Sequence, residues 1–178
     1  MLCICTVKMK RILYIICSVL LLASCTKEDR NLMLVNQEEA IDKYISSLKN
    51  VRIARNSGSN RLVATEGKGL DSLEVGDTVN FYYAGYIFSS GKGSLFATNN
   101  PEVAQKAQFP LSGGIESAVL GSGSLISGLD NGLLGAKAGE ICQIVFSAKY
   151  GYENEAVYNV PKMSPLIFEV CVESIGKN

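Results

Sequence analysis

The sequence predicts an α+β fold in which an antiparallel β-sheet carries little helix. Residues 140–147 and 166–175 alternate apolar side chains with others at a period of two, which is typical of half-buried strands. Fifteen of the 17 glycines lie between Gly67 and Gly151. Such a density of turns suits short antiparallel strands better than βαβ units.

The first 24 residues are predicted to be a signal peptide. Basic side chains at Lys8, Lys10 and Arg11 precede a 12-residue uncharged run, 12–23. Twelve helical residues span about 18 Å, which is too short for a hydrocarbon core of about 30 Å. A basic segment, a short apolar run and then small residues are typical of a secretory signal.

The end of this run, Leu22-Ala23-Ser24-Cys25, resembles the bacterial lipobox. The resemblance implies that Cys25 becomes the first mature residue and carries a diacylglycerol thioether and an acylated amine. Several acyl chains give stable membrane anchoring. The following Lys27-Glu28-Asp29 resembles the surface-export tag of Bacteroidetes lipoproteins, and a solvated charged tether is the alternative. We therefore expect a lipid-anchored protein of the cell envelope, in the outer membrane, either periplasmic or surface-exposed.

The composition excludes several kinds of chemistry. The chain contains no histidine, which rules out Ser-His-Asp and Cys-His catalysis and every histidine-containing zinc site. Without its first 24 residues, the chain has 14 basic and 17 acidic side chains. A net acidic chain without a long basic block is a poor nucleic-acid binder. We therefore expect no nucleic-acid partner, no metal and no cofactor.

Residues 25–59 are predicted to form a lipidated tether and one amphipathic helix. Asn36 is a candidate N-cap for a helix over 37–49, in which Ile41, Tyr44, Ile45 and Leu48 form one apolar stripe. This helix either packs on the main domain or acts as a spacer. The polar run 56–60 is predicted to be a loop and the boundary of the main domain, 60–178.

Within 60–178 the sequence predicts short strands and two short helices. Residues 62–65 and 78–88 are expected to be strands, with a turn at 75–77 between them. A helix is expected to begin at Asn100-Pro101, because Asn is a good cap and Pro suits the first helical position. A second helix is expected between Ile126 and Leu134. The glycine-containing run 120–124 lacks a phosphate-loop spacing, and we interpret it as a tight turn.

Two cysteines, Cys142 and Cys171, remain in the predicted mature domain. Cys142 lies on the same side of its strand as Ile144 and Phe146. Cys171, in contrast, lies on the opposite side of its strand from the most apolar residues. Side chains on different faces of a sheet cannot reach each other. We therefore predict two free thiols.

Several short sequence motifs lie where predicted strands meet turns. They are Tyr82-Tyr83-Ala84-Gly85, Ser94-Leu95-Phe96, Leu125-Ile126-Ser127-Gly128-Leu129, Tyr150-Gly151-Tyr152, Val160-Pro161 and Leu166-Ile167-Phe168-Glu169-Val170. In this order and spacing, over about 62–175, they resemble the FKBP-type peptidyl-prolyl cis-trans isomerases. The resemblance implies an antiparallel sheet of five to six strands curled around one short helix, here preceded by the tether and N-terminal helix.

The resemblance also implies a site. An apolar pocket between helix and sheet would bind an Xaa-Pro segment and catalyse isomerisation of its peptide bond. The walls would be formed by Tyr83, Phe96, Tyr152, Val160 and Phe168, with Leu129 as the floor. Ile126 would offer its backbone N–H to a ligand carbonyl, and Tyr152 would donate a hydrogen bond from its phenol.

The sequence departs from the family pattern at several positions. Active members usually have Asp after the pocket Phe, where this chain has Ala97, and often Trp at the floor, where it has Leu129. Aromatic residues expected on the following strand are replaced by Glu116 and Ala118. These departures predict reduced activity. They keep two alternatives open: a non-catalytic FKBP-like lipoprotein that binds peptides or a partner, and a structural envelope lipoprotein.

Overall fold

The computed structural model describes residues 27–178. The predictions for the signal peptide and for lipidation of Cys25 lie outside the described residues. Contacts group Gln37–Asn178 into one compact unit, which contains the whole sheet.

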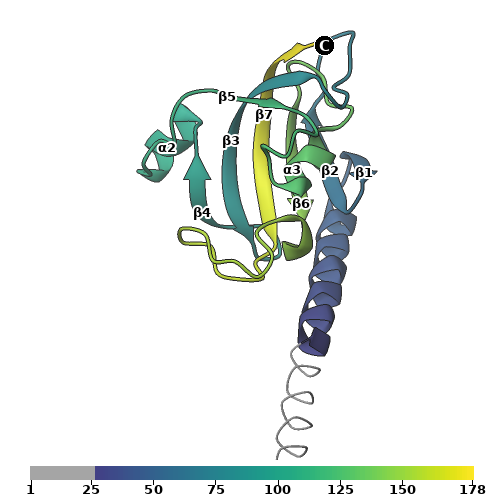
Figure 1. The fold of residues 1–178 in the computed structure, drawn as a ribbon, viewed down its shortest axis with the longest axis vertical. Helices are drawn as coiled ribbons and strands as arrows, with labels where there is room; N and C mark the ends of the chain where they lie inside the picture. The colour runs from purple at the N-terminus through teal and green to yellow at the C-terminus, as the bar shows by residue number, and fades with distance from the viewer. Residues whose placement is uncertain (1–26) are drawn as a thin grey trace, which may run out of the picture. The chain divides into compact units, whose positions relative to one another are not determined.

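A seven-stranded antiparallel sheet forms the framework of this unit (Figure 1). Its order is β1-β2-β6-β7-β3-β4, and β5 also pairs with β3. The strands are β1 (Arg52–Asn56), β2 (Ser59–Thr65), β3 (Thr78–Phe88), β4 (Lys92–Thr98), β5 (Glu116–Val119), β6 (Ile141–Phe146) and β7 (Leu166–Gly176). The predicted α+β class is confirmed, with one strand more than expected.

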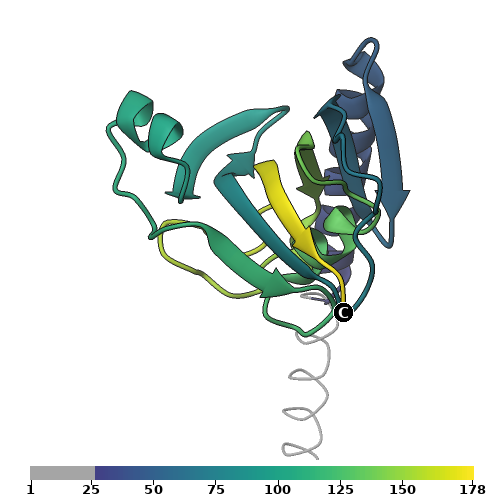
Figure 2. The same cartoon turned by 90° about the horizontal axis from the view of Figure 1, so that it is seen from above.

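Three short helical segments accompany the sheet. They are α2 (Pro101–Ala107), α3 (Ser127–Leu133) and the 3-10 helix η1 (Ala148–Tyr150). The Asn100 side chain accepts hydrogen bonds from the N–H groups of Glu102 and Val103. This cap confirms the predicted helix start. Figure 2 shows the sheet curving, with α2 beyond β4.

The inner face of the sheet packs on α3. Leu129 and Leu133 of α3 join a buried core with side chains such as Ile144 and Phe146 of β6. A Cβ on Gly128 would lie 2.5 Å from the Phe146 ring, so only glycine lets α3 approach β6 this closely. The alternation predicted for β6 is confirmed, because Cys142, Ile144 and Phe146 share this inner core.

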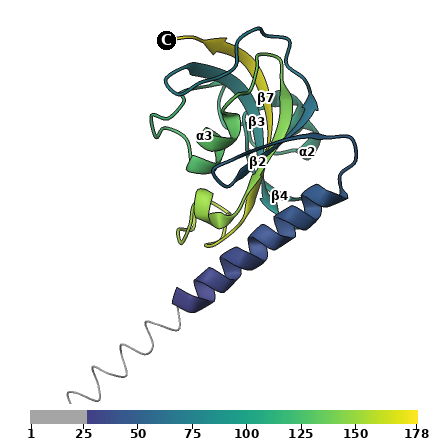
Figure 3. The same cartoon turned by 90° about the vertical axis from the view of Figure 1, so that its right-hand side faces the viewer.

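The outer face of the sheet packs on the N-terminal helix. Ile41 and Ile45 are 0% and 2% exposed and share a cluster with Leu62, Val145 and Ile167. The predicted apolar stripe is therefore the buried face of this helix. Helical structure covers 27–47, so Asn36 is not its cap and 27–36 is not an extended tether. Figure 3 shows this helix leading into β1.

The predicted loop at 56–60 is a tight hairpin turn between β1 and β2. Asn56 pairs with Ser59, and Arg52 pairs with Val63 at the other end of the hairpin. This hairpin and the residues of the helix from Gln37 onward lie in the same compact unit as the domain that we expected to begin at residue 60. The polar turn sequence indicated a boundary, but β2 continues directly into pairing with β6.

The two cysteines are free thiols, as predicted. Cys142 is buried in the inner core, and burial, with a smaller contribution from Glu140, raises its pKa to about 12. Cys171 is partly exposed and contacts the Glu173 carboxylate. A thiol with a raised pKa is a poor nucleophile at neutral pH.

Candidate active site

A cavity of about 800 Å³ lies at the inner face of the sheet next to α3. Its walls come from β3, β4, β5, β7, the start of α3 and the three loops that precede β5, α3 and β7. The lining residues are Phe81, Tyr83, Phe96, Ala97, Phe109, Pro110, Leu111, Ser112, Glu116, Ser124, Leu125, Ile126, Leu129, Tyr152, Tyr158, Asn159 and Phe168. A concave site that combines aromatic and aliphatic walls with polar groups is typical of small-ligand and peptide pockets.

Three neighbouring strands place the aromatic wall of this cavity. Phe168 of β7 has its ring centroid 6.1 Å from that of Tyr83 on β3 and 5.7 Å from that of Phe96 on β4. The Phe96 and Phe168 rings are perpendicular, at 90°, which is a favourable edge-to-face arrangement. On its other side, Phe168 stacks on the buried ring of Phe146. The cavity wall is therefore continuous with the core.

Ile126 and Leu129, at the start of α3, form one end of the cavity. Arg61 on β2 holds the opposite end of this helix. Its Nη1 donates hydrogen bonds to the carbonyls of Gly132, Leu133 and Leu134, at 3.3, 3.2 and 2.8 Å. These are carbonyl groups that a helix C-terminus leaves without intrahelical partners. Arg61 thereby fixes where α3 points.

The buried Arg61 guanidinium is itself paired. Its Nε lies 3.1 Å from Oε1 of Glu140, and the two side chains are 3% and 0% exposed. Removing one partner of such a pair leaves an uncompensated buried charge and is strongly destabilising. Arg61 and Glu140 therefore act together as the support of α3.

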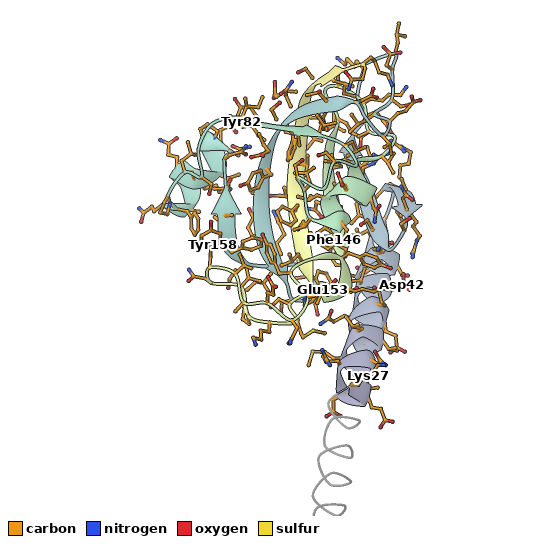
Figure 4. All side chains as sticks on the ribbon, viewed as in Figure 1. Lys27, Asp42, Tyr82, Phe146, Glu153 and Tyr158 are labelled. Atoms are coloured by element: carbon orange, nitrogen blue, oxygen red, sulfur yellow. The ribbon has the colours of Figure 1, made fainter. Side chains whose placement is uncertain are left out.

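The loop between η1 and β7 carries Tyr152 and Tyr158 to the cavity. Tyr158 is labelled in Figure 4. Gln37 holds both ends of this loop. Its Oε1 accepts a hydrogen bond from the Ala148 N–H at 2.9 Å, and its Nε2 donates to the Met163 carbonyl at 2.7 Å. One side chain of the N-terminal helix thus closes the base of the loop that positions Tyr152.

The segment between β4 and β5 forms another part of the wall. The buried Asn99 side chain accepts from the Tyr83 N–H and donates to the carbonyls of Phe81 and Gly114. The Asn99 side chain thereby pairs with the part of β3 that lies between the residues paired with β4 and the residues paired with β5. Ser112 exchanges two hydrogen bonds with the Thr98 backbone. These contacts hold Phe109 and Ser112 in the cavity wall.

The polar groups of the cavity lining are tyrosine and serine hydroxyls, one asparagine amide and one carboxylate. Burial raises the pKa of Tyr152, and the nearby Tyr83 and Tyr158 raise it further. Burial and the charge of Glu116 raise the pKa of Tyr83, while a hydrogen bond with the Ser112 side chain lowers it. Both phenols are protonated at neutral pH and are available as hydrogen-bond donors.

Residues 27–178 contain no group of three or more Cys, Asp or Glu side chains that could hold a metal ion. In the same part of the chain, no helix is long and apolar enough to cross a membrane.

Comparison with known proteins identifies the family. The sequence profile of the family described as FKBP-type peptidyl-prolyl cis-trans isomerase matches residues 70–173. The chain belongs to this family. It is 32% identical over 117 residues to FK506-binding protein 1 of Aspergillus oryzae, which covers 64% of this chain and 94% of that protein. It is 34% identical over 108 residues to FK506-binding protein 1A of Neurospora crassa, covering 60% and 79% of the two chains.

Solved structures show the same fold. A peptidyl-prolyl cis-trans isomerase from Pseudomonas syringae pv. tomato superposes with a TM-score of 0.61 at 18% identity, covering 83% of this chain and 96% of that one. The three FKBP domains of wheat FKBP73 give a TM-score of 0.58 at 21% identity, covering 72% of this chain and 50% of that chain. The curled antiparallel sheet expected from the resemblance is therefore the FKBP fold.

Most of the residues that the FKBP resemblance assigned to the site line one cavity. These are Tyr83, Phe96, Ala97, Ile126, Leu129, Tyr152 and Phe168. Val160 does not line it. Its side chain is 1% exposed within the inner core, where its backbone pairs with Val157 across a tight turn. A single apolar residue beside a proline does not reveal which way its side chain points, so the sequence could not make this distinction.

The structure adds lining residues that sequence reasoning did not assign. Phe81 lies two residues before Tyr83 on β3, and therefore on the same face of the sheet. The period-two pattern of this strand could have identified it as a lining residue. Phe109 reaches the cavity from a loop without periodicity. Its own N–H donates to the Ala104 carbonyl, and the Asn99 and Ser112 hydrogen bonds hold the segment that follows it. Tyr158 is 91% exposed at the rim, in a backbone conformation with φ of 51°. No pattern in the sequence signals these last two.

Proposed function

We propose that this protein catalyses cis–trans isomerisation of Xaa-Pro peptide bonds in the 800 Å³ cavity. The observation that carries the proposal is the aromatic box of Tyr83, Phe96, Tyr152 and Phe168, closed by Leu129, in a member of an isomerase family. Flat aromatic walls suit the apolar pyrrolidine ring of proline.

The chemistry needs no nucleophile or proton transfer. The rotation barrier of about 18–20 kcal/mol comes from amide resonance, which the twisted transition state has lost. A water-poor pocket that fits the twisted amide better than the planar one lowers this barrier. Hydrogen bonds from the Tyr152 phenol and from the Ile126 N–H, at the start of α3, would hold the substrate carbonyls while the bond rotates.

The departures from the family pattern bear on efficiency. Ala97 lies in the cavity wall and has no polar group to orient the tyrosines. Leu129 keeps the floor apolar but is smaller than the tryptophan often found there. We therefore expect lower kcat/KM than in members that retain both groups.

We further propose that the protein works outside the cytoplasm, held to the membrane by lipid on Cys25. The lipobox-like Leu22-Ala23-Ser24-Cys25 supports this. Clients would be exposed Xaa-Pro segments of envelope or exported proteins. Mass spectrometry of the protein from membranes should find diacylglycerol on Cys25, and Cys25→Ala should release the chain to the soluble fraction. An unmodified N-terminus still carrying residues 1–24 would overturn this location.

The first test of catalysis is Tyr152→Phe, which removes one hydroxyl and leaves the ring. Relaxation of a cis Xaa-Pro peptide should be accelerated by the protein, and kcat/KM should fall about tenfold or more in the variant, the loss of one good hydrogen bond to the reacting group. Tyr82→Phe is the matched control, because Tyr82 lies next to Tyr83 on β3 but outside the cavity lining. Equal rates for both variants would contradict the site.

Truncation of Phe168 is a poorer test. Its ring is 3% exposed and contacts the rings of Tyr83, Phe96 and Phe146. Phe168→Ala would remove part of the core and cost about 3–5 kcal/mol of stability. Loss of activity in that variant would therefore not separate catalysis from folding.

A second candidate function is peptide binding without catalysis, and Ala97 is the observation that favours it. This alternative predicts that proline peptides bind in the cavity and cause chemical-shift changes at Tyr83 and Tyr152. It also predicts that relaxation rates match those of a protein-free sample. Binding together with Tyr152-dependent acceleration would exclude it.

A further inference from the structure

The wall of the cavity contains a carboxylate where the FKBP resemblance leads one to expect an aromatic side chain. Glu116 is the first residue of β5 and pairs with Phe81 of β3. Among the lining residues of the described chain, it is the only acidic or basic one. The other lining side chains are apolar, hydroxyl or amide groups, so Glu116 determines the charge of the site.

Glu116 is partly buried and has no cationic partner. None of the ion pairs within residues 27–178 includes it. The negative charge of Glu116 acts on groups inside the cavity, since this charge contributes to the raised pKa of Tyr83. A carboxylate next to apolar walls has lost part of its hydration, and charge interactions are stronger there than in water. A cation supplied by a ligand would complete this pair.

A second hollow next to the cavity has the same sign of charge. It has a volume of about 480 Å³ and is lined by Gly151, Tyr152, Glu153, Asn154 and Glu155. Tyr152 belongs to both walls, so a polypeptide that leaves the cavity past Tyr152 reaches two more carboxylates. Neither lining includes a lysine or arginine of the described chain. Figure 4 shows Glu153 on the loop between η1 and β7.

We propose that this site selects Xaa-Pro segments that carry a lysine or arginine beside the proline, with Glu116 as the residue that determines the preference. The inference rests on the proposed isomerase function and names its substrate class. Glu153 and Glu155 extend the preference along the chain of the substrate. An acidic residue beside proline is disfavoured by the same groups.

The test compares short peptides that differ at one position beside proline, occupied by Lys, Gln or Glu. One series varies the residue before proline and the other the residue after it. With the purified protein, kcat/KM in at least one series should follow Lys above Gln above Glu. The Lys-to-Gln ratio should be about two- to fivefold, as for partly exposed ion pairs, and it should shrink as ionic strength rises.

The variant Glu116→Gln keeps the shape of the side chain and removes its charge. The Lys-to-Gln ratio should fall towards one in this variant, whatever its activity on the Gln peptide. Glu39→Gln removes an exposed carboxylate of the N-terminal helix and should leave the ratio unchanged. Equal rates for the three peptides in both series, or an unchanged ratio in Glu116→Gln, would overturn the proposal.

Binding of the same peptides, followed by titration calorimetry, separates this inference from the isomerase function. If no peptide is isomerised faster, but the Lys peptide binds tighter than the Glu peptide and this difference requires Glu116, then catalysis is refuted and the charge selection holds. If the Lys and Glu peptides bind equally well, the charge selection is refuted whatever the rates.

Discussion

At the scale of single residues, the aromatic box depends on a missing side chain. Gly85 lies on β3, where the rings of Phe96 and Phe168 meet. A Cβ at this position would be 2.8 Å from an atom of each ring. No real side chain can be accommodated there unless the rings separate. Gly85, in the motif Tyr82-Tyr83-Ala84-Gly85, is therefore required by the packing of the two rings and not by its backbone conformation.

We predict that Gly85→Ala damages the cavity. The added methyl group should force Phe96 and Phe168 apart, with a loss of stability of about 1–3 kcal/mol. Isomerase activity should fall more than stability alone explains, because the walls that hold proline move. Urea unfolding and peptide relaxation rates measure the two effects on the same samples.

Gly114→Ala provides the control for this substitution. Gly114 has open space around its Cβ position and does not adopt a positive φ. Alanine there should be neutral or slightly stabilising. If Gly85→Ala behaved like Gly114→Ala in both measurements, the close approach at Gly85 would have no role in the site.

At the scale of elements, the N-terminal helix does more than cover the sheet. Its buried side chains, Ile41 and Ile45, secure it to the outer face. Its Gln37 side chain then reaches the Ala148 N–H and the Met163 carbonyl. The helix therefore connects to the loop that carries Tyr152, although its sequence indicated only a packed helix or a spacer.

We predict that Gln37→Ala loosens this loop. Two partly buried hydrogen bonds are lost, and their backbone partners remain, which should cost about 1–3 kcal/mol. Amide hydrogen exchange should increase between residues 148 and 163, and KM for Xaa-Pro peptides should rise as Tyr152 becomes less well placed. Glu39→Ala, an exposed change on the same helix, should do neither. Unchanged exchange in the loop of Gln37→Ala would contradict the role of this contact.

The elements differ in how well the sequence predicts them. The bounds of β3 agree with the prediction because Thr78–Phe88 is dense in β-branched and aromatic residues. The α2 start agrees because Asn100-Pro101 is a strong local signal. β1 was missed because Arg52 and Arg55 interrupt its apolar residues, and its order comes from pairing with β2. The helical structure of 27–36 was missed because its side chains lack an apolar stripe.

The site was predictable where strands and α3 form it. Tyr83, Phe96 and Phe168 alternate with outward residues, so their strands determine their direction. Residues on the connecting segments were not predictable in this way. Phe109 is held by its backbone hydrogen bond to Ala104 of α2 and by the bonds of Asn99 to the following segment, and Val160 points into the core because of a local turn. Neither interaction leaves a periodic pattern in the sequence.

At the scale of the whole molecule, carboxylates determine the response to acid, because the chain has no histidine. Asp77 is the clearest case. Its Oδ2 accepts hydrogen bonds from Lys177 Nζ and the Glu74 N–H, both at 2.8 Å. The hydrogen bond from Lys177, more than any other contact, lowers the pKa of Asp77. This contact ties the end of β7 to the turn before β3.

The lowered pKa of Asp77 gives the sign of the effect on stability. The carboxyl group is more easily ionised in the folded chain than in the unfolded chain, where its pKa is about 3.9. Its contribution is therefore fully present above that value and is lost as the pH falls through the lower pKa of the folded state. Asp77→Asn should lower Tm at pH 7, and the difference in Tm from the unmodified protein should shrink as the pH falls below about 4.

Calorimetric unfolding between pH 7 and pH 2 tests this prediction, with Asp71→Asn as the control. Asp71 is exposed, so loss of its charge should change Tm little at any pH. Lys177→Gln should reproduce part of the Asp77→Asn effect, because it removes the main cause of the lowered pKa and leaves the Glu74 N–H in place. A Tm difference for Asp77→Asn that stayed constant across this range would show that the amide disturbs packing and that the ion pair contributes no pH-dependent stability.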